Sequence, residues 1–286
     1  IPKGAFTILQ TEVQGREIRD GRDFMKGNRL TDPYAADFES DQVRRLPQPP
    51  LCKAPMRGEE ARVKLPMDFE NLALEGDLLE LLKRRKSHRV YTEENLSLLQ
   101  LSFLLWASQG IKGRRGKAYA TLRTVPSGGA RHAFETYLAV RHVEGLNPGI
   151  YHYLPEENAV ELLHTEDNLE EAVIESLAGQ KWAGKASAVF YWSMVAYRAE
   201  WRYGIYAHRV ALIDAGHVGE NLTLAAEAEK VGSCAVAAVS HEACCKLLEI
   251  DGEEEFPIYA MPVGTVKPED QAAEQEIYRF VKEQDL

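Results

Sequence analysis

The sequence predicts an α+β fold in which helices flank one mixed sheet. Three observations lead to this expectation. Three strand-like segments follow one another with turn signals between them, residues 187–196 form a strongly apolar run, and residues 210–230 have the spacing of a long helix. The chain has 286 residues, of which 45% are hydrophobic and 27% are charged, so it is long enough to bury a sizeable core as one large or two small domains.

The first part of the chain differs from the rest. Residues 1–75 carry many charges and several prolines and show no sustained helical or strand period. We therefore expect an extended N-terminal arm with short helical pieces over 1–75. Loops of this length usually wrap or cover something, and a partner subunit is one candidate. A globular domain with a C-terminal arm or helix is then expected over 76–286.

Two helices are expected at the start of this domain. Leucines at 78, 79, 81 and 82 indicate a short helix that runs into the basic residues 83–86. Thr92 is the expected N-cap of a second helix that ends at Ser108 before Gly110. Its apolar face would consist of Leu96, Leu99, Phe103 and Trp106.

The middle of the chain predicts an antiparallel meander. Residues 134–143 are rich in β-branched and aromatic side chains, and Asn147-Pro148-Gly149 is a turn signal. Strands are expected next over 150–154 and 159–163, followed by a short helix over 168–177.

The last third alternates strands and helices. Residues 187–196 are apolar on both faces, which predicts a central strand. After the long helix over 210–230, Gly232-Ser233-Cys234 is expected to break the chain before a short strand over 235–239. A helix capped by Ser240 and a strand over 257–263 follow, and residues from Gly264 onward are expected to form the arm or terminal helix.

Composition excludes several classes of function. Lys and Arg number 34 and Asp and Glu number 44, giving a net charge of −10, which is unfavourable for a nucleic-acid binder but leaves room for a local phosphate pocket. The least charged long stretch, residues 96–111, is shorter than the roughly 20 apolar residues that span a bilayer, so no membrane partner is expected.

The cysteines and the N-terminal residues give information on the cellular location of the protein. The four cysteines have no zinc-site spacing, so no metal is expected, and we interpret them as reduced thiols of a cytoplasmic protein. No signal peptide is visible. Because the chain opens at Ile1 rather than Met, a segment upstream of it can be missing.

A basic run is the first candidate for binding chemistry. Five cations and the hydroxyl of Ser87 lie between positions 83 and 89. Guanidinium groups bind phosphate oxygens in pairs, and a hydroxyl can complete the shell. A solvated helix end with cations near its C-terminus, or a nuclear-localisation signal, would explain the same residues.

Three glycine-containing loops are further candidates, namely 125–131, 232–234 and 264–267. Glycine lets a backbone approach a ligand closely and point its amides at it, although each loop alone is equally compatible with an ordinary turn. His217 lies within the long helix and is interpreted as structural. The dinucleotide-binding, phosphate-loop, zinc-protease and nucleophile-elbow motifs are absent from the sequence.

The order of three motifs resembles the FMN-dependent nitroreductase superfamily. These are Arg-x-Ser-x-Arg at 85–89, Pro-Ser-Gly-Gly-Ala at 126–130, and the helical run Asp-Ala-Gly-His-Val-Gly-Glu-Asn-Leu at 214–222. The sequence is most similar to the SagB-type branch, which includes azoline dehydrogenases of peptide-toxin biosynthesis. The resemblance covers roughly residues 78–268 and leaves the leading arm uncovered.

The resemblance implies a mostly antiparallel central sheet and a homodimer with two FMN sites at the subunit interface. It also implies a cofactor-binding role for nine residues. Arg85, Ser87 and Arg89 match positions at the FMN phosphate and pyrimidine edge, Pro126, Ser127 and Gly128 match the loop along the isoalloxazine, Gly232 and Ser233 match the segment near N5, and Lys267 matches a further phosphate cation.

One departure from the azoline dehydrogenases concerns the catalytic base. Those enzymes have a Lys-Tyr pair ahead of the glycine-histidine helix, whereas this chain has Arg202-Tyr203. Arginine stays protonated near neutral pH and is a poor base, so azoline oxidation is not implied. The catalytic candidates are then Tyr203 and Arg89, the latter as a cation that stabilises reduced flavin. Trp201, Tyr203 and Tyr206 would either line the acceptor pocket or pack in a core or interface.

The leading hypothesis is an FMN-dependent oxidoreductase. It would pass hydride or electrons from NADH or NADPH through flavin N5 to a small planar acceptor such as a nitroaromatic, quinone or enone, with ping-pong kinetics. Two alternatives remain open: a flavin-binding or flavin-modifying protein of the same superfamily without nicotinamide-driven turnover, and an acidic interaction protein that binds no flavin.

Overall fold

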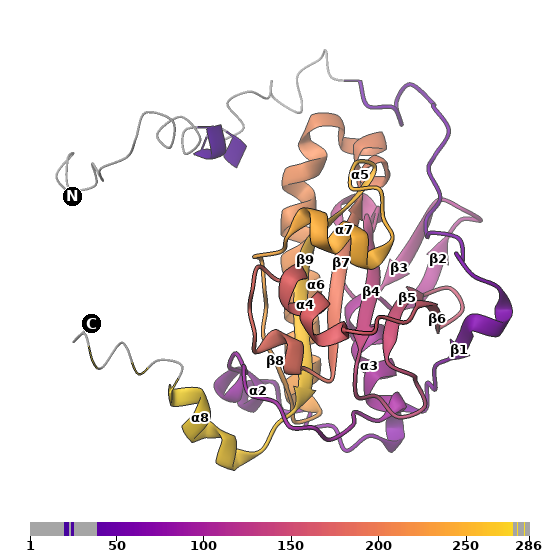
Figure 1. The fold of residues 1–286 in the computed structure, drawn as a ribbon. Coiled ribbons are helices and arrows are strands. Elements are labelled where there is room, and N and C mark those ends of the chain that lie inside the picture. The colour runs from indigo at the N-terminus through magenta and orange to yellow at the C-terminus, as the bar shows by residue number, and fades with distance from the viewer. Residues whose placement is uncertain (1–19, 23, 26–38, 277–278, 280–282, 284–286) are drawn as a thin grey trace.

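The protein folds around a seven-stranded sheet with helices on both faces (Figure 1). A computed structural model describes residues 20–22, 24–25, 39–276, 279 and 283. The sheet has the order β1-β6-β5-β4-β7-β9-β8, and a separate hairpin is formed by β2 and β3. Every described pair of neighbouring strands is antiparallel, which confirms the predicted α+β fold with a mostly antiparallel sheet.

The strands are β1 (Arg62–Lys64), β2 (Ile111–Arg115), β3 (Ala120–Arg123), β4 (Phe134–Val140), β5 (Gly149–Leu154), β6 (Ala159–His164), β7 (Ala188–Val195), β8 (Val231–Ser233) and β9 (Glu255–Thr265). The helices are α2 (Leu78–Arg84), α3 (Leu98–Gln109), α4 (Leu169–Ser176), α5 (Ala196–Tyr203), α6 (Ala207–Ala228), α7 (His241–Leu248) and α8 (Gln271–Glu276).

Strand β7 is central, as predicted from its apolar run. It lies between β4 and β9 and sends alternate side chains into two separate cores. Phe190 and Trp192 belong to the core shared with α3 and α6, whereas Val189 and Tyr191 belong to the core shared with α4 and α7. Because both faces are buried, each position of the strand favours an apolar residue. The predicted meander of β4, β5 and β6 is also confirmed.

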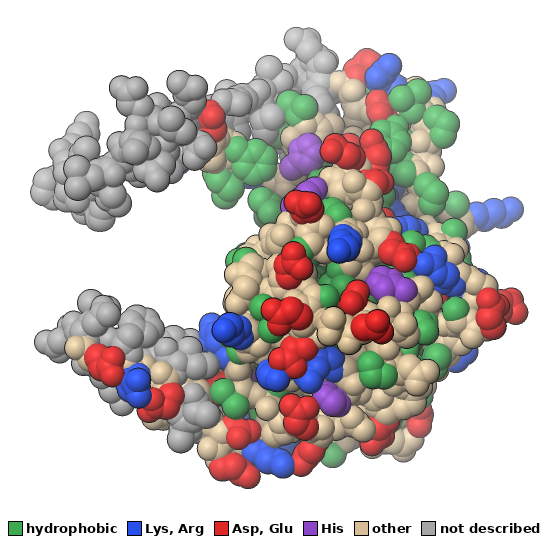
Figure 2. Space-filling model, viewed as in Figure 1, with side chains coloured by type: hydrophobic (Ala, Val, Ile, Leu, Met, Phe, Trp, Pro, Cys, Tyr) green, Lys and Arg blue, Asp and Glu red, His purple; other side chains and the backbone are tan. Residues whose placement is uncertain are grey.

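Two pairs of helices cover the sheet. Helices α4 and α7 lie on the face toward the viewer, and α3 and α6 lie on the other (Figure 1). Acidic side chains are prominent over α4 and α7 (Figure 2), among them Glu171, Glu175 and Glu242. Helix α6 has 22 residues and buries small side chains such as Ala211, Ala215 and Ala226, which allows close packing against its neighbours.

The predicted start of the helix over 92–108 was wrong. Helix α3 begins at Leu98 and is capped by Ser97, whose hydroxyl accepts from the amide of Gln100 while the Gln100 side chain accepts from the amide of Ser97. Thr92 instead donates its backbone amide to the Thr265 carbonyl at 2.9 Å, so the chain before α3 runs along β9.

The predicted strand over 235–239 was also wrong. The strand is β8, which overlaps the segment 232–234 that was expected to be a break, and it pairs with the end of β9. From the predicted range only Val236 bridges a strand, at Ala260. A Cβ on Gly232 would lie 2.7 Å from Cβ of His88, so glycine is needed there for the neighbouring segment to pack against β8. Helix α5 and the β2–β3 hairpin had not been predicted from the sequence.

Both ends of the chain extend beyond the described residues. Of the predicted arm over 1–75, residues 39–75 lie against the domain, and their strand β1 pairs with β6 at the sheet edge. At the other end, α8 follows β9, and the apolar residues Ile277, Tyr278, Phe280 and Val281 lie outside the described residues. No helix in the described part of the chain is both long and apolar enough to cross a bilayer.

Substituting the cap of α3 tests how this helix begins. We expect Ser97→Ala to lower the free energy of unfolding by about 1 kcal/mol, because an N-terminal amide of the helix loses its acceptor. Urea denaturation followed by circular dichroism measures this change. Ser97→Asp, which keeps a side-chain acceptor, should stay close to wild type, and equal stability of the alanine and aspartate variants would contradict the assignment.

Candidate functional site

The segment after α2 brings the basic run to the edge of the sheet. Asp77 caps α2 by accepting from the amide of Glu80, and the helix ends at Arg84. The chain then follows β8, where the amide of His88 donates to the Ser233 carbonyl at 2.9 Å. The Tyr91 hydroxyl donates to the His88 carbonyl at 2.7 Å.

A cavity of about 150 Å³ opens between this segment, β8 and α6. It brings together three of the predicted cofactor-binding residues, Arg85, Ser87 and Ser233. The remaining lining residues are Lys86, Gly216, Gly219, Glu220, Thr223, Ala235 and Tyr259.

Arg85 is the notable cation of this cavity. Its neighbours Lys83 and Arg84 are paired, Lys83 with Glu80 and Arg84 with Glu75 and Glu227. Within the described residues, the Arg85 side chain has no hydrogen-bond or ion-pair partner, and it stands beside the hydroxyls of the cavity. An open guanidinium fork next to hydroxyl groups suits a phosphate group.

Two glycines of α6 line the cavity. A Cβ on Gly216 would meet nothing within 4 Å, whereas a Cβ on Gly219 would lie 2.6 Å from the ring of Tyr259. Glycine at positions three apart lies on one face of a helix, so this face of α6 is open at Gly216 and packs against Tyr259 at Gly219. Both glycines belong to the motif at 214–222, but they were not predicted to line the site. Their spacing of three residues was the signal that could have indicated it.

The Pro126-Ser127-Gly128 loop is fixed to the same helix. The Ser127 hydroxyl donates to Asp214 at 2.7 Å, and the Gly128 amide donates to the same carboxylate at 3.1 Å. Burial raises the pKa of Asp214, and these two hydrogen bonds oppose the rise. Pro126 and Ser127 line a different hollow, beside β3.

The loop and the cavity therefore occupy successive turns of α6. Asp214 and Thr223 are nine residues apart, which is about 14 Å along a helix that rises 1.5 Å per residue. An extended ligand that follows this helix would meet the loop at one end and the cavity at the other.

Besides the three residues of the glycine loop, three more predicted cofactor-binding residues lie outside this cavity. The Arg89 guanidinium is 5.7 Å from the ring centre of Trp182, and its backbone amide donates to Glu274 at 2.5 Å. Lys267 pairs with Glu94 at 2.6 Å. Gly232 serves packing against His88, as described above. A direct role of Arg89, Gly232 and Lys267 in binding FMN stays a prediction.

The aromatic candidates fall into different environments. Trp201 is buried, and its indole donates to the Leu46 carbonyl at 3.0 Å, which is a packing role. Tyr203 ends α5 next to the glycine loop, since a Cβ on Gly129 would lie 2.8 Å from its hydroxyl. Tyr206 follows within the short turn before α6.

Two further polar residues, His217 and Arg202, are not buried in the core. His217, interpreted from sequence as structural, is exposed on α6, one turn from Asp214. Arg202 donates to the Tyr119 hydroxyl at 3.0 Å. Among the residues described, no group of His, Cys, Asp or Glu is arranged to hold a metal ion.

The chain belongs to the nitroreductase family, which is a family of oxidoreductases. Residues 82–265 match that family, a range that contains the basic segment, the glycine loop and all of α6. The superfamily expected from the three motifs is thereby confirmed, whereas the SagB-type branch is not.

One relative covers most of the chain. A protein of Methanocaldococcus jannaschii that is named as a nitroreductase is 31% identical over 207 residues, which is 72% of this chain and 98% of that protein.

Solved structures support the fold. A protein of Ralstonia eutropha, also named as a nitroreductase, has a TM-score of 0.59 at 24% identity and covers 78% of this chain and 99% of its own. A chain of the Escherichia coli microcin synthetase McbBCD complex, with truncated pro-MccB17 bound, has a TM-score of 0.56 at 19% identity over 88% of this chain and 92% of that chain.

The Asp214 contacts can be tested directly. We expect Asp214→Ala to lower the free energy of unfolding by about 2 kcal/mol, because a charged acceptor of two hydrogen bonds is lost. Hydrogen exchange at the Gly128 amide should accelerate at least tenfold. His217→Ala removes an exposed side chain from the same helix and should change neither quantity. Unchanged exchange at Gly128 in Asp214→Ala would show that the loop is held by other contacts.

Proposed function

We propose that this protein is an FMN-dependent oxidoreductase that passes hydride or electrons from NADH or NADPH to a small planar acceptor. The observation that carries the proposal is the unpartnered Arg85 guanidinium beside Ser87 and Ser233, in a cavity floored by the glycines of α6. Family membership supplies the oxidoreductase class.

The residues of the cavity fit the phosphate end of FMN. Arg85 and Lys86 offer positive charge, and Ser87 and Ser233 offer hydroxyl donors. A small helix residue such as Gly216, with open space around it, leaves room for the ribityl chain. Glu220 is the acidic member of the lining and would favour the hydroxyl groups of such a chain over a second phosphate.

FMN, when bound, supplies hydride transfer at its N5 atom. The chain's own residues would bind and orient it. Arg85 would hold the phosphate, and the Ser127–Gly128 loop, fixed by Asp214, would lie along α6 at the other end of the site. Because the loop already has its hydrogen bonds, little ordering would be needed when a planar group packs against it.

The acceptor side of the proposal rests on Tyr203 and Arg202. Burial alone would lower the pKa of Arg202, but the hydrogen bond to Tyr119 and the nearby tyrosines raise it overall. A guanidinium held protonated cannot act as the base that azoline oxidation needs. We therefore favour transfer to a nitroaromatic, quinone or enone over azoline oxidation.

Exposed apolar side chains support a homodimer. Helix α6 carries the proposed site. Two of its apolar residues are exposed, Leu212 at 49% and Ile213 at 57%. Helix α2 exposes Leu78, Leu79 and Leu82 next to the basic segment. Burying these side chains against a second copy would remove apolar surface from water close to the cavity.

Removal of Arg85 tests the phosphate contact. We expect Arg85→Ala to weaken FMN binding about 30-fold, as for the loss of about 2 kcal/mol of charged hydrogen bonding. Flavin fluorescence titration measures the dissociation constant. Arg84→Ala is the matched control, because Arg84 is paired with Glu75 and Glu227, and it should bind FMN like wild type. Equal affinity of the two variants would place the phosphate elsewhere.

Turnover distinguishes the reductase from a flavin-binding protein. Under anaerobic conditions, NADH or NADPH should bleach the absorbance of the FMN-loaded protein, and a nitroaromatic or quinone should restore it. A flavin band that persists with both donors would favour the flavin-binding alternative. Protein that stays colourless after FMN addition and desalting would leave the interaction-protein alternative.

A further inference from the structure

The β2–β3 hairpin and the glycine loop form one continuous basic segment of an otherwise acidic chain. Residues 111–134 contain six Lys and Arg residues and no Asp or Glu, although the chain as a whole has a net charge of −10. The six are Lys112, Arg114, Arg115, Lys117, Arg123 and Arg131. Like charges so close together repel one another and create a positive local field, which favours a negatively charged ligand.

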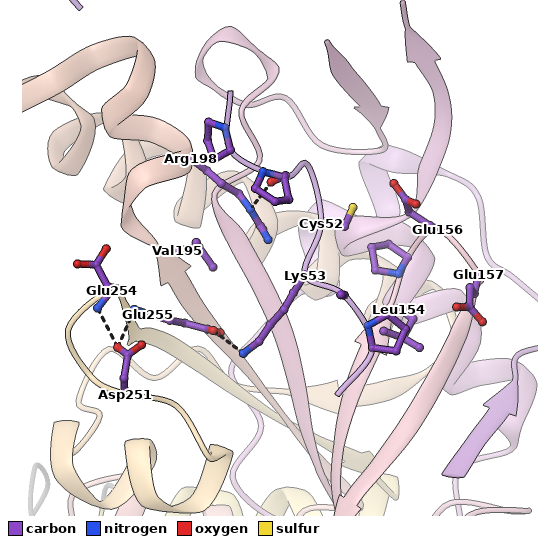
Figure 3. Close-up of a pocket in the computed structure, with 15 residues that line it drawn as sticks. Cys52, Lys53, Leu154, Glu156, Glu157, Val195, Arg198, Asp251, Glu254 and Glu255 are labelled. Atoms are coloured by element: carbon purple, nitrogen blue, oxygen red, sulfur yellow. Dashed lines mark hydrogen bonds and ion pairs between the residues drawn. The ribbon is translucent and has the colours of Figure 1, made fainter. Parts of the chain in front are cut away.

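Three of these cations already have partners within the protein. Arg114 pairs with Glu156 at 2.7 Å, and Glu156 is among the residues drawn around a cavity of about 540 Å³ in Figure 3. Arg123 and Arg131 are buried and donate to acceptors of the chain itself. These three guanidinium groups therefore serve the fold.

The other three cations, Lys112, Arg115 and Lys117, are exposed. Their side chains form no ion pair or hydrogen bond with any residue that the structure describes. Lys112 and Arg115 are three residues apart in a strand that rises about 3.3 Å per residue, so their positions are about 10 Å apart. Charges spread over such a distance suit a ligand with several anionic groups better than one small ion.

The turn of the hairpin is fixed to the domain. The Tyr119 carbonyl accepts from Nη2 of Arg131 at 2.7 Å, and the Tyr119 hydroxyl accepts from Arg202 at 3.0 Å. Arg115 and Lys117 adjoin this anchored residue. Their backbone is therefore held in place, and less conformational freedom would be lost when a ligand binds.

A hollow of about 550 Å³ joins the hairpin to the glycine loop. Lys112 lines it together with Pro126 and Ser127 of the loop, and Leu122 adds apolar surface. A flat ring can pack against this surface with a cation beside it. Because Asp214 ties Ser127 to α6, the hollow adjoins the loop that is proposed to lie along the flavin ring.

The number of unpaired cations favours one of the two nicotinamide donors. NADH and NADPH share an adenine ring and a pyrophosphate with two negative charges, and NADPH adds a 2′-phosphate on the adenosine ribose. A phosphate monoester carries a charge of about −1.5 to −2 at neutral pH. Two cations would neutralise the pyrophosphate, whereas three cations along one hairpin can also pair with the 2′-phosphate.

We propose that the β2–β3 hairpin binds the phosphates of the reduced nicotinamide donor and selects NADPH over NADH, with Lys112, Arg115 and Lys117 as the contacts. This inference rests on the proposed function, because it names the donor of that reaction. The hairpin contributes to binding alone, so the rate of hydride transfer from a bound donor is independent of it.

Anaerobic reduction of the full-length, FMN-loaded protein tests the preference. Stopped-flow absorbance over a range of donor concentrations gives the dissociation constant of each donor and the limiting rate of flavin reduction. Wild-type protein should bind NADPH at least tenfold more tightly than NADH. The combined variant Lys112→Gln, Arg115→Gln and Lys117→Gln should lose at least tenfold in NADPH affinity and less than threefold in NADH affinity, with the limiting rate unchanged.

Arg114→Gln is the matched control on the same hairpin. Arg114 is paired with Glu156, so this variant should keep the affinity and the preference of wild type. Adenosine 2′-phosphate is a probe that needs no turnover. Its binding, followed by saturation-transfer difference NMR, should be at least tenfold weaker in the triple variant than in wild type and in Arg114→Gln.

The two proposals fail in different ways. If neither donor reduces the flavin, the proposed function fails, and the binding of adenosine 2′-phosphate still decides the role of the hairpin. If both donors reduce the flavin but bind equally well, or if the triple variant prefers NADPH as wild type does, the reductase stands and the present inference is overturned. An equal loss in Arg114→Gln and the triple variant would overturn it as well, because overall charge would then be the cause.

Discussion

Helix α6 is the constraint on which the proposed site depends. Its buried face of small residues packs against α3 and the sheet, which fixes its position. From that position it anchors the glycine loop through Asp214 and presents two glycines to the basic segment. Loop, helix and segment come from distant parts of the chain, and one rigid element holds them in register. Sites built on such elements keep their geometry better than sites built on loops alone.

Charge pairing separates the cations of the basic run into different roles. Arg84 binds Glu75 and Glu227 and ties α2 to α6, so it serves the fold. Arg85, the next residue, points its guanidinium to a cavity and keeps it available for an anion. In a chain with a net charge of −10, carboxylates are available to pair with most cations, and the neighbours Lys83 and Arg84 are paired in this way.

Sequence patterns predicted most of the sheet because buried strand positions require apolar residues. The two-sided apolar run of β7 and the meander of β4 to β6 were recognisable for this reason. The start of α3 was misplaced because Thr92 and Ser97 are both good caps, and the choice depends on the pairing of Thr92 with Thr265, far along the chain. Strand β8 was missed because its three residues include a glycine, whose presence is explained only by the close approach of Val266 and His88.

The order of the three motifs, the acidic composition and the alternation of strands and helices are properties of the sequence, and they sufficed for the superfamily and the fold class. Which cation remains unpaired was decided by tertiary structure, since Glu227, a partner of Arg84, lies 143 positions away in the sequence. Only folding determines which buried donors are left without an acceptor among the described residues.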